Sequence, residues 1–115
     1  MYITTRNIRG YKNTLKNHLL KRRTDKDKSG IIFLQKTKCL GEELASIAQK
    51  VWKGCESIAV NARGAAGGMG ILWNPRVVLL SGFLATTCTL STDFHILGTR
   101  IWGVISNVYG PPRAE

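Results

Sequence analysis

This 115-residue chain contains apolar stretches that are expected to form strands, and three polar residues lie at the ends of such stretches. Asn7 lies at the end of the stretch Ile3–Ile8, and Tyr109 follows Val108 just before a Gly-Pro-Pro turn. An asparagine amide both donates and accepts, so it can orient a phosphate or a metal-bound water, and a phenol can donate to a phosphate oxygen. The alternatives stay open, since Asn commonly begins turns and a Tyr can pack at a sheet rim.

Lys36 is the third of these side chains, and it follows the apolar run Ile31–Gln35. Such a strand often delivers one polar side chain to an active site, and here that side chain is a cation. An ammonium group has three donors and no acceptor, so Lys36 can neutralise a phosphate but cannot bind a metal ion.

Other sequence patterns for chemistry are weak. Cys39, Cys55 and Cys88 form no CxxC pair, and both histidines lie far from them in the sequence, which disfavours a zinc site. The cysteines are expected to be reduced thiols in an intracellular protein. The stretch RGAAGGMG, residues 63–70, lacks the Lys-Ser/Thr of a phosphate loop and precedes a strand, so it is interpreted as a turn.

The positive charge of the chain is concentrated in its first third. The net charge is +10, and residues 1–38 contain eleven Lys and Arg against two Asp. A surface of this kind attracts polyanions, and nucleic acid is the commonest of them. Arg9, Lys12 and Lys38 are the candidate nucleic-acid-binding residues. The alternative is a solvated basic helix and loop.

The spacing of apolar residues predicts two helices. Tyr11, Leu15 and Leu19 form a stripe at intervals of four, which indicates a helix over 11–23 that packs against a sheet. A second helix is expected over 41–53, with Glu42 and Glu43 favourable at its start. Its inward face is predicted to hold Leu44, Ile47, Ala48 and Val51.

The remaining apolar stretches predict strands. Residues 31–35 are continuously apolar, as in a strand buried on both faces. A short strand is expected over 55–60. After residue 70 the chain is expected to be all strand, with breaks at Asn-Pro, Gly and Ser-Thr-Asp, and these later strands to be antiparallel. The expected segments are 71–74, 76–83, 86–91, 94–100 and 101–110.

This order of elements indicates a mixed α/β (α+β) domain in which helices cover a sheet. The length suits one domain, residues 1–115. No apolar run approaches the roughly 20 residues of a membrane-spanning helix, and the N-terminus lacks the apolar core of a secretory signal. An intracellular protein without a membrane partner is therefore expected.

Taken in order, four motifs resemble one family. They are N-I-R-G at 7–10, I-I-F-L-Q-K-T-K-C at 31–39, G-G-M-G-I-L-W at 67–73 and N-V-Y-G-P-P at 107–112. The set resembles the N-terminal half of an endonuclease/exonuclease/phosphatase domain, and most closely the endonuclease of plant LINE-type retrotransposons. The resemblance implies about half of a DNase I-like, four-layer α/β/β/α sandwich with a mixed sheet and two helices.

The resemblance also implies a nuclear, Mg²⁺-dependent phosphodiesterase site at one rim of the sandwich. Asn7 corresponds to the family's active-site asparagine and Tyr109 to the tyrosine that contacts the scissile phosphate. Lys36 stands where the family has the metal-binding glutamate, and Arg6 where such elements typically have tryptophan.

The lysine at position 36 predicts a site without a metal ligand there. Mg²⁺ takes oxygen ligands, and an ammonium group in place of a carboxylate removes one ligand and repels the ion. The family's remaining acids and catalytic histidine belong to a second half that this sequence does not include. His95 is expected to be a partly buried sheet residue and not that histidine. The sequence therefore predicts an inactive, incomplete domain that binds no Mg²⁺ by itself.

Two further functions stay open from the sequence. One is a nucleic-acid-binding module that uses the basic first third. The other is an assembly partner of a complementary half domain. A halved sandwich is expected to expose the apolar face that its partner sheet would cover, so self-association through that sheet face is also predicted.

Overall fold

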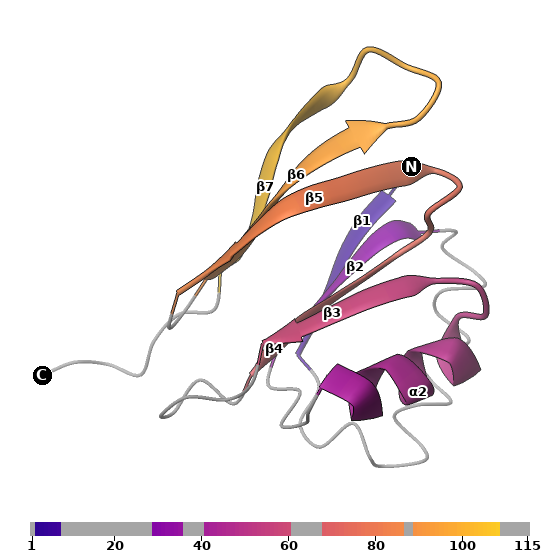
Figure 1. The fold of residues 1–115 in the computed structure, drawn as a ribbon, viewed down its shortest axis with the longest axis vertical. Helices are drawn as coiled ribbons and strands as arrows, with labels where there is room; N and C mark the ends of the chain where they lie inside the picture. The colour runs from indigo at the N-terminus through magenta and orange to yellow at the C-terminus, as the bar shows by residue number, and fades with distance from the viewer. Residues whose placement is uncertain (1, 8–28, 36–40, 61–67, 87–88, 109–115) are drawn as a thin grey trace, which may run out of the picture.

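A computed structural model describes residues 2–7, 29–35, 41–60, 68–86 and 89–108 of the chain. Two β-sheets lie face to face, and a helix covers the side of the first sheet that points away from the second sheet (Figure 1). This is a partial α+β sandwich, as the resemblance implies. The expected helix over 11–23 lies outside the described residues, so the described layers are helix, sheet and sheet.

The first sheet has four strands in the order β1-β2-β4-β3. Strands β1 (Tyr2–Asn7) and β2 (Ser29–Gln35) are parallel, whereas β4 (Met69–Trp73) is antiparallel to both β2 and β3 (Glu56–Val60). The central strand β2 is buried on both faces from Ile31 to Leu34, which confirms the prediction from its continuous apolar run.

The second sheet is an antiparallel meander of three strands. β5 (Val78–Ala85) pairs with β6 (Thr89–Ile96), and β6 pairs with β7 (Trp102–Val108). The sequence predicted two separate strands in place of β6, with a break at Ser-Thr-Asp. That prediction is wrong, because all three residues pair with β7, Ser91 and Asp93 also pair with β5, and the chain turns only after Ile96.

Helix α2 (Gly41–Val51) packs on the first sheet through an apolar stripe. Leu44, Ala48 and Val51 are buried and Ile47 is partly buried, as predicted, and they contact Ile32, Leu34 and Leu72 of the sheet. The helix ends two residues earlier than predicted. The Gln49 side chain stabilises the turn that follows, since its Nε2 donates to the carbonyl of Cys55 at 2.6 Å and its Oε1 accepts from the amide of Gly54 at 3.0 Å.

A second apolar core fills the space between the two sheets. Its buried members are Ile31, Phe33, Met69 and Ile71 from the first sheet and Val78, Leu80 and Leu90 from the second. The expectation that the apolar face of one sheet would lack a partner sheet is therefore wrong, because this chain supplies strands of both sheets. Among the described residues, no helix is long and apolar enough to cross a membrane.

Exposed apolar side chains lie instead on the other side of the second sheet. In an antiparallel pair, residues opposite each other share a face, and the pairing places Leu79, His95 and Trp102 in one row facing away from the core. We call the exposed apolar residues of this side the outer face. They are Leu79, Leu84, Trp102, Val104 and Val108.

Candidate functional site

The ends of three strands meet at one edge of the sandwich, which we call the rim. Asn7, the last residue of β1, is the register partner of Gln35, the last residue of β2. The side chain of Gln35 in turn donates to the carbonyl of Val108, the last residue of β7 in the opposite sheet, at 2.9 Å. Strand ends that are 28 and 73 positions apart along the chain are thereby joined at one place.

The rim includes one pair of amide side chains that bridges the two sheets. Nε2 of Gln35 donates to Oδ1 of Asn107 at 3.2 Å, and Nδ2 of Asn107 donates to the carbonyl of Leu34 at 3.2 Å. Asn107 is only 2% exposed. Burying an amide is costly unless both its ends are hydrogen-bonded, and here each end of the Asn107 amide has a partner. We call Gln35 and Asn107 the amide pair.

The predicted site residues fall at or beside these strand ends. Asn7 is the last residue of β1, where the sequence placed it, and the structure describes its backbone only. Lys36 follows Gln35 directly in the chain, and Tyr109 follows Val108. Lys36 and Tyr109 lie outside the described residues, as do Arg9, Lys12 and Lys38. Their roles stay predictions.

The amide pair is a feature that the sequence reasoning missed. Gln35 belongs to the motif I-I-F-L-Q and Asn107 to N-V-Y-G, each beside a candidate residue, but the sequence does not identify them as a pair. A signal was present, because a polar residue at the end of a fully buried strand needs a hydrogen-bond partner. The sequence could not show that the partner lies in the other sheet.

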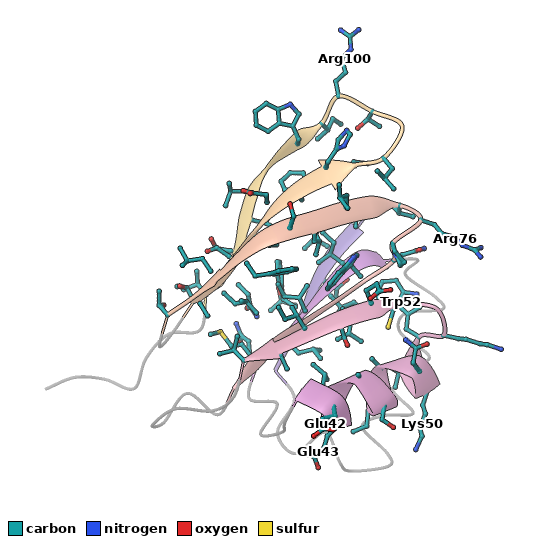
Figure 2. The ribbon with its side chains drawn as sticks, viewed as in Figure 1. Glu42, Glu43, Lys50, Trp52, Arg76 and Arg100 are labelled. Atoms are coloured by element: carbon teal, nitrogen blue, oxygen red, sulfur yellow. The ribbon has the colours of Figure 1, made fainter. Side chains whose placement is uncertain are left out.

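The described cationic side chains lie away from the rim. Arg76 follows β4 at the end opposite to Met69, the residue of β4 that pairs with Gln35, and Arg100 lies in the turn before β7. Figure 2 shows both side chains pointing outward from the molecule at different turns, and Lys50 pointing away from the sheets on α2. Within the described part of the chain, these cations therefore form no common surface with the rim.

The donor atoms at the rim do not fit a magnesium ion. The described side chains there are amides bonded to each other and to backbone carbonyls, whereas Mg²⁺ in proteins is held through carboxylates. The segment that follows β2, KTKCL, contains two lysines and no carboxylate. Glu42 and Glu43 project from the first turn of α2 on the side away from the sheets (Figure 2). No cluster of three or more His, Cys, Asp or Glu occurs among the described residues.

His95 is a half-buried residue of β6, as predicted, and it is far along the strand from the rim. Its Nε2 lies 2.8 Å from the carbonyl oxygen of Thr99 in the turn between β6 and β7. Its register partner is Trp102, at the end of β7 opposite to Val108. The His95 side chain therefore contacts the backbone of the turn that joins β6 and β7.

No family model and no curated protein matches the sequence. Solved structures do match the fold. An endonuclease/exonuclease/phosphatase protein from Bacteroides vulgatus gives a TM-score of 0.64 at 8% identity over 91% of this chain. AP endonuclease LMAP from Leishmania major gives 0.63 at 16% over 94%, and D. rerio TDP2, complexed with a single-strand DNA product, gives 0.58 at 15% over 90%.

These similarities concern part of each matched protein. The chain covers 49%, 40% and 44%, respectively, of the lengths of these three structures. At such low identity the comparison establishes the fold and not the chemistry. The described strands and helix therefore have the fold of endonuclease/exonuclease/phosphatase proteins, over rather less than half the length of those proteins.

Proposed function

We propose that this chain forms the first half of an endonuclease/exonuclease/phosphatase-type phosphodiesterase domain, of the kind found in plant LINE-type retrotransposons. In this proposal the 115 residues bind nucleic acid at the rim and do not cleave it by themselves. The observation that carries the proposal is the meeting of β1, β2 and β7 at the rim, where these strands end at Asn7, Gln35 and Val108. Lys36 and Tyr109 follow the last two of these residues directly in the sequence.

The proposed binding rests on the charge of the segments that continue from these strand ends. Arg9 follows β1 by two residues, while Lys36 and Lys38 follow β2 by one and three. In the proposal these cations, with Lys12, face the phosphates of a nucleic acid in the nucleus. Lys36 then acts as a fixed positive charge in place of a metal ion that a glutamate would bind.

The proposed lack of cleavage rests on coordination chemistry. A metal-assisted phosphodiesterase needs carboxylate ligands to hold the ion and a base to orient the attacking water. Position 36 supplies an ammonium group, and the described rim supplies amides and carbonyls. A divalent ion near Lys36 would also be repelled by its charge.

Binding is tested by fluorescence anisotropy of the full chain with a labelled DNA duplex over a series of salt concentrations. The logarithm of the affinity should fall linearly with the logarithm of the salt concentration, because phosphate contacts release counterions. Replacing Arg9, Lys12 or Lys38 by Gln should weaken binding and make this slope shallower by about one per contact. Arg76→Gln and Arg100→Gln make the same charge change far from the rim and should leave the affinity unchanged. No detectable binding at low salt would contradict the proposal.

Cleavage is tested with supercoiled plasmid and with a duplex containing an abasic site, in the presence of Mg²⁺. We expect no nicking above the buffer control. Nicking that disappears in Tyr109→Phe would show an active site in this chain and overturn the proposal.

The role of position 36 has its own test. Lys36→Glu restores a carboxylate and removes the repulsion, so we expect it to bind Mn²⁺ more tightly, as measured by paramagnetic resonance of the free ion. We expect no gain of nicking, because a metal-assisted site needs further carboxylate ligands and a base, whereas the described rim offers amides and carbonyls. Equal Mn²⁺ affinity in Lys36→Gln and Lys36→Glu would show that position 36 is not beside a cation site.

A further inference from the structure

We propose that Gln35 and Asn107, the amide pair, are positioning residues that set the separation between the end of β2 and the end of β7. This inference rests on the proposed function, because Lys36 and Tyr109 continue directly from those two strand ends. The amide pair makes no contact with a substrate in this proposal. It holds the backbone at the ends of β2 and β7, and Lys36 and Tyr109 are the next residues along the chain after those ends.

The first argument concerns which backbone groups the amide pair holds. The carbonyl of Leu34 belongs to the peptide that joins residues 34 and 35, and it accepts a hydrogen bond from Nδ2 of Asn107. The carbonyl of Val108 belongs to the peptide that joins residues 108 and 109, and it accepts one from Nε2 of Gln35. Each strand end is thus bonded to a side chain from the other, and the Gln35–Asn107 bond closes the arrangement.

The second argument is that Asn107 is exceptional in its surroundings. The only polar residues buried among the described part of the chain are Thr92 and Asn107. Thr92 donates within its own sheet, to the carbonyl of Ser81 at 2.7 Å. Of these two residues, only Asn107 makes a hydrogen bond across the space between the sheets, where the neighbouring contacts are apolar.

The third argument is energetic. A buried hydrogen-bonded amide contributes little net stability relative to apolar side chains of the same shape, because its bonds replace bonds to water. Apolar contacts hold two sheets together but do not define their relative position along the strands as sharply as directional bonds do. The amide pair therefore accounts better for a fixed geometry at the rim than for the stability of the core.

The test uses the full chain with fluorotyrosine incorporated and follows the ¹⁹F resonance of Tyr109. The chain has three tyrosines, and Tyr109→Phe identifies the signal. Asn107→Asp keeps the size of the side chain and the acceptor for Gln35 but loses the donor to Leu34. Asn107→Leu and Gln35→Leu remove the bonds altogether. Far-ultraviolet circular dichroism establishes that each variant is folded.

The matched control is Ser106→Ala. Ser106 precedes Asn107 on β7, and its hydroxyl lies 2.7 Å from that of Ser91 on the exposed side of the sheet. The control removes a cross-strand hydrogen bond one residue away without touching the amide pair. It should change neither the Tyr109 resonance nor DNA binding.

We expect folded Asn107→Asp to shift or broaden the Tyr109 resonance and to weaken binding of the labelled duplex by about tenfold. The double variant Gln35→Leu with Asn107→Leu should be no worse than either single variant, because the two residues act as one unit. An unchanged Tyr109 resonance in folded Asn107→Asp overturns the inference. Because the resonance is measured without DNA, this result is distinct from a failure of the wild-type chain to bind duplex, which would contradict the proposed function instead.

Discussion

Cys55 is held as a neutral thiol by its surroundings. It is 4% exposed at the end of the turn after α2, and its Sγ lies 3.7 Å from the carbonyl oxygen of Ala48, to which the thiol donates. Burial, together with the neighbouring negative charge of Glu56, raises the pKa of the Cys55 thiol to about 11. Since the thiolate is the reactive species, this cysteine is expected to be inert at neutral pH.

Alkylation checks this expectation at Cys55. In a Cys39→Ser, Cys88→Ser background, iodoacetamide at pH 8 should modify native Cys55 far more slowly than the same residue in urea. Mass spectrometry gives both rates. Equal alkylation rates in the native protein and in urea would mean that the Cys55 thiol is not buried in solution and that its pKa is not raised.

The same pKa shift predicts how stability depends on pH. The neutral thiol is favoured in the folded state, so this contribution is complete below the ordinary pKa of 9.0 and is lost as the pH rises to about 11. Urea unfolding from pH 8 to 11 should show a steeper loss of unfolding free energy in the native sequence than in Cys55→Ala. Parallel curves for the two proteins would contradict the prediction.

At the residue scale, the sequence predicted where the candidate side chains stand better than what they bond to. The sequence places Asn7 at the end of the strand expected over Ile3–Ile8, and β1 does end at Asn7. The bonds of Gln35 to Asn107 and Val108 join residues 72 and 73 positions apart, and no local pattern encodes such a contact. Sequence spacing constrains neighbours along the chain, whereas the rim is assembled from different sheets.

A β-bulge in β5 is the clearest irregularity at the scale of the elements. Ser81 pairs with Asp93 and Leu84 with Ser91, so two residues of β5, Gly82 and Phe83, stand opposite the single residue between those partners. Gly82 has φ of +63°. The extra residue lets the Phe83 ring contact Trp73 of the first sheet, with ring centroids 5.8 Å apart.

The bulge requires glycine for two reasons that mutation can separate. A Cβ on Gly82 would lie 2.6 Å from Oδ2 of Asp93, in addition to the strain of a positive φ. Gly98, with φ of +78°, has open space around its Cβ position. We expect Gly82→Ala and Gly98→Ala each to cost about 1 kcal/mol in urea unfolding for the positive φ. Gly82→Ala should cost slightly more, because the exposed Asp93 carboxylate has to move away from the new Cβ.

Removing the Asp93 carboxylate provides the control. In an Asp93→Ala background the steric part disappears, and the cost of Gly82→Ala should approach that of Gly98→Ala. A cost that is equal in both backgrounds would show that Asp93 does not crowd the bulge.

At this scale, periodicity predicted the elements well and their ends poorly. The stripe of Leu44, Ala48 and Val51 identified α2, because burial of one helix face depends on spacing alone. The prediction of a break at the Ser-Thr-Asp stretch is wrong, because this stretch lies within β6. The sheet tolerates the polar side chains of this stretch because Ser91 and Asp93 point to its exposed side. The hydroxyl of the buried Thr92 donates a hydrogen bond to the carbonyl of Ser81.

For the whole molecule, the main correction is the position of the exposed apolar surface. The sequence predicted an uncovered inner face, because half of a sandwich was taken to mean one of its two sheets. The chain instead builds part of each sheet, and the inner faces cover each other. How a fold divides its sheets along the chain is a matter of topology, which residue patterns do not reveal.

We propose that a second copy of the chain covers the outer face. Trp102 is 76% exposed and Leu84 67%, and contiguous exposed apolar side chains commonly mark an interaction surface.

Sedimentation of the full chain tests this association. Trp102→Lys should shift the equilibrium toward monomer at least tenfold, since a charge in the contact is left unpaired. Arg100→Lys changes a neighbouring residue without changing the charge and should have no effect. A wild-type chain that remains monomeric at all concentrations would contradict the association.

The strand order β1-β2-β4-β3 has a consequence for how the protein emerges from the ribosome. Among the described strands of the first sheet, β3 hydrogen-bonds only to β4, although β4 is translated later. Residues 56–60 must therefore wait without a partner strand until residues 69–73 have left the exit tunnel. A nascent chain stalled between these two segments would hold α2 and β3 beside a sheet that lacks β4, the strand that joins β3 to β2.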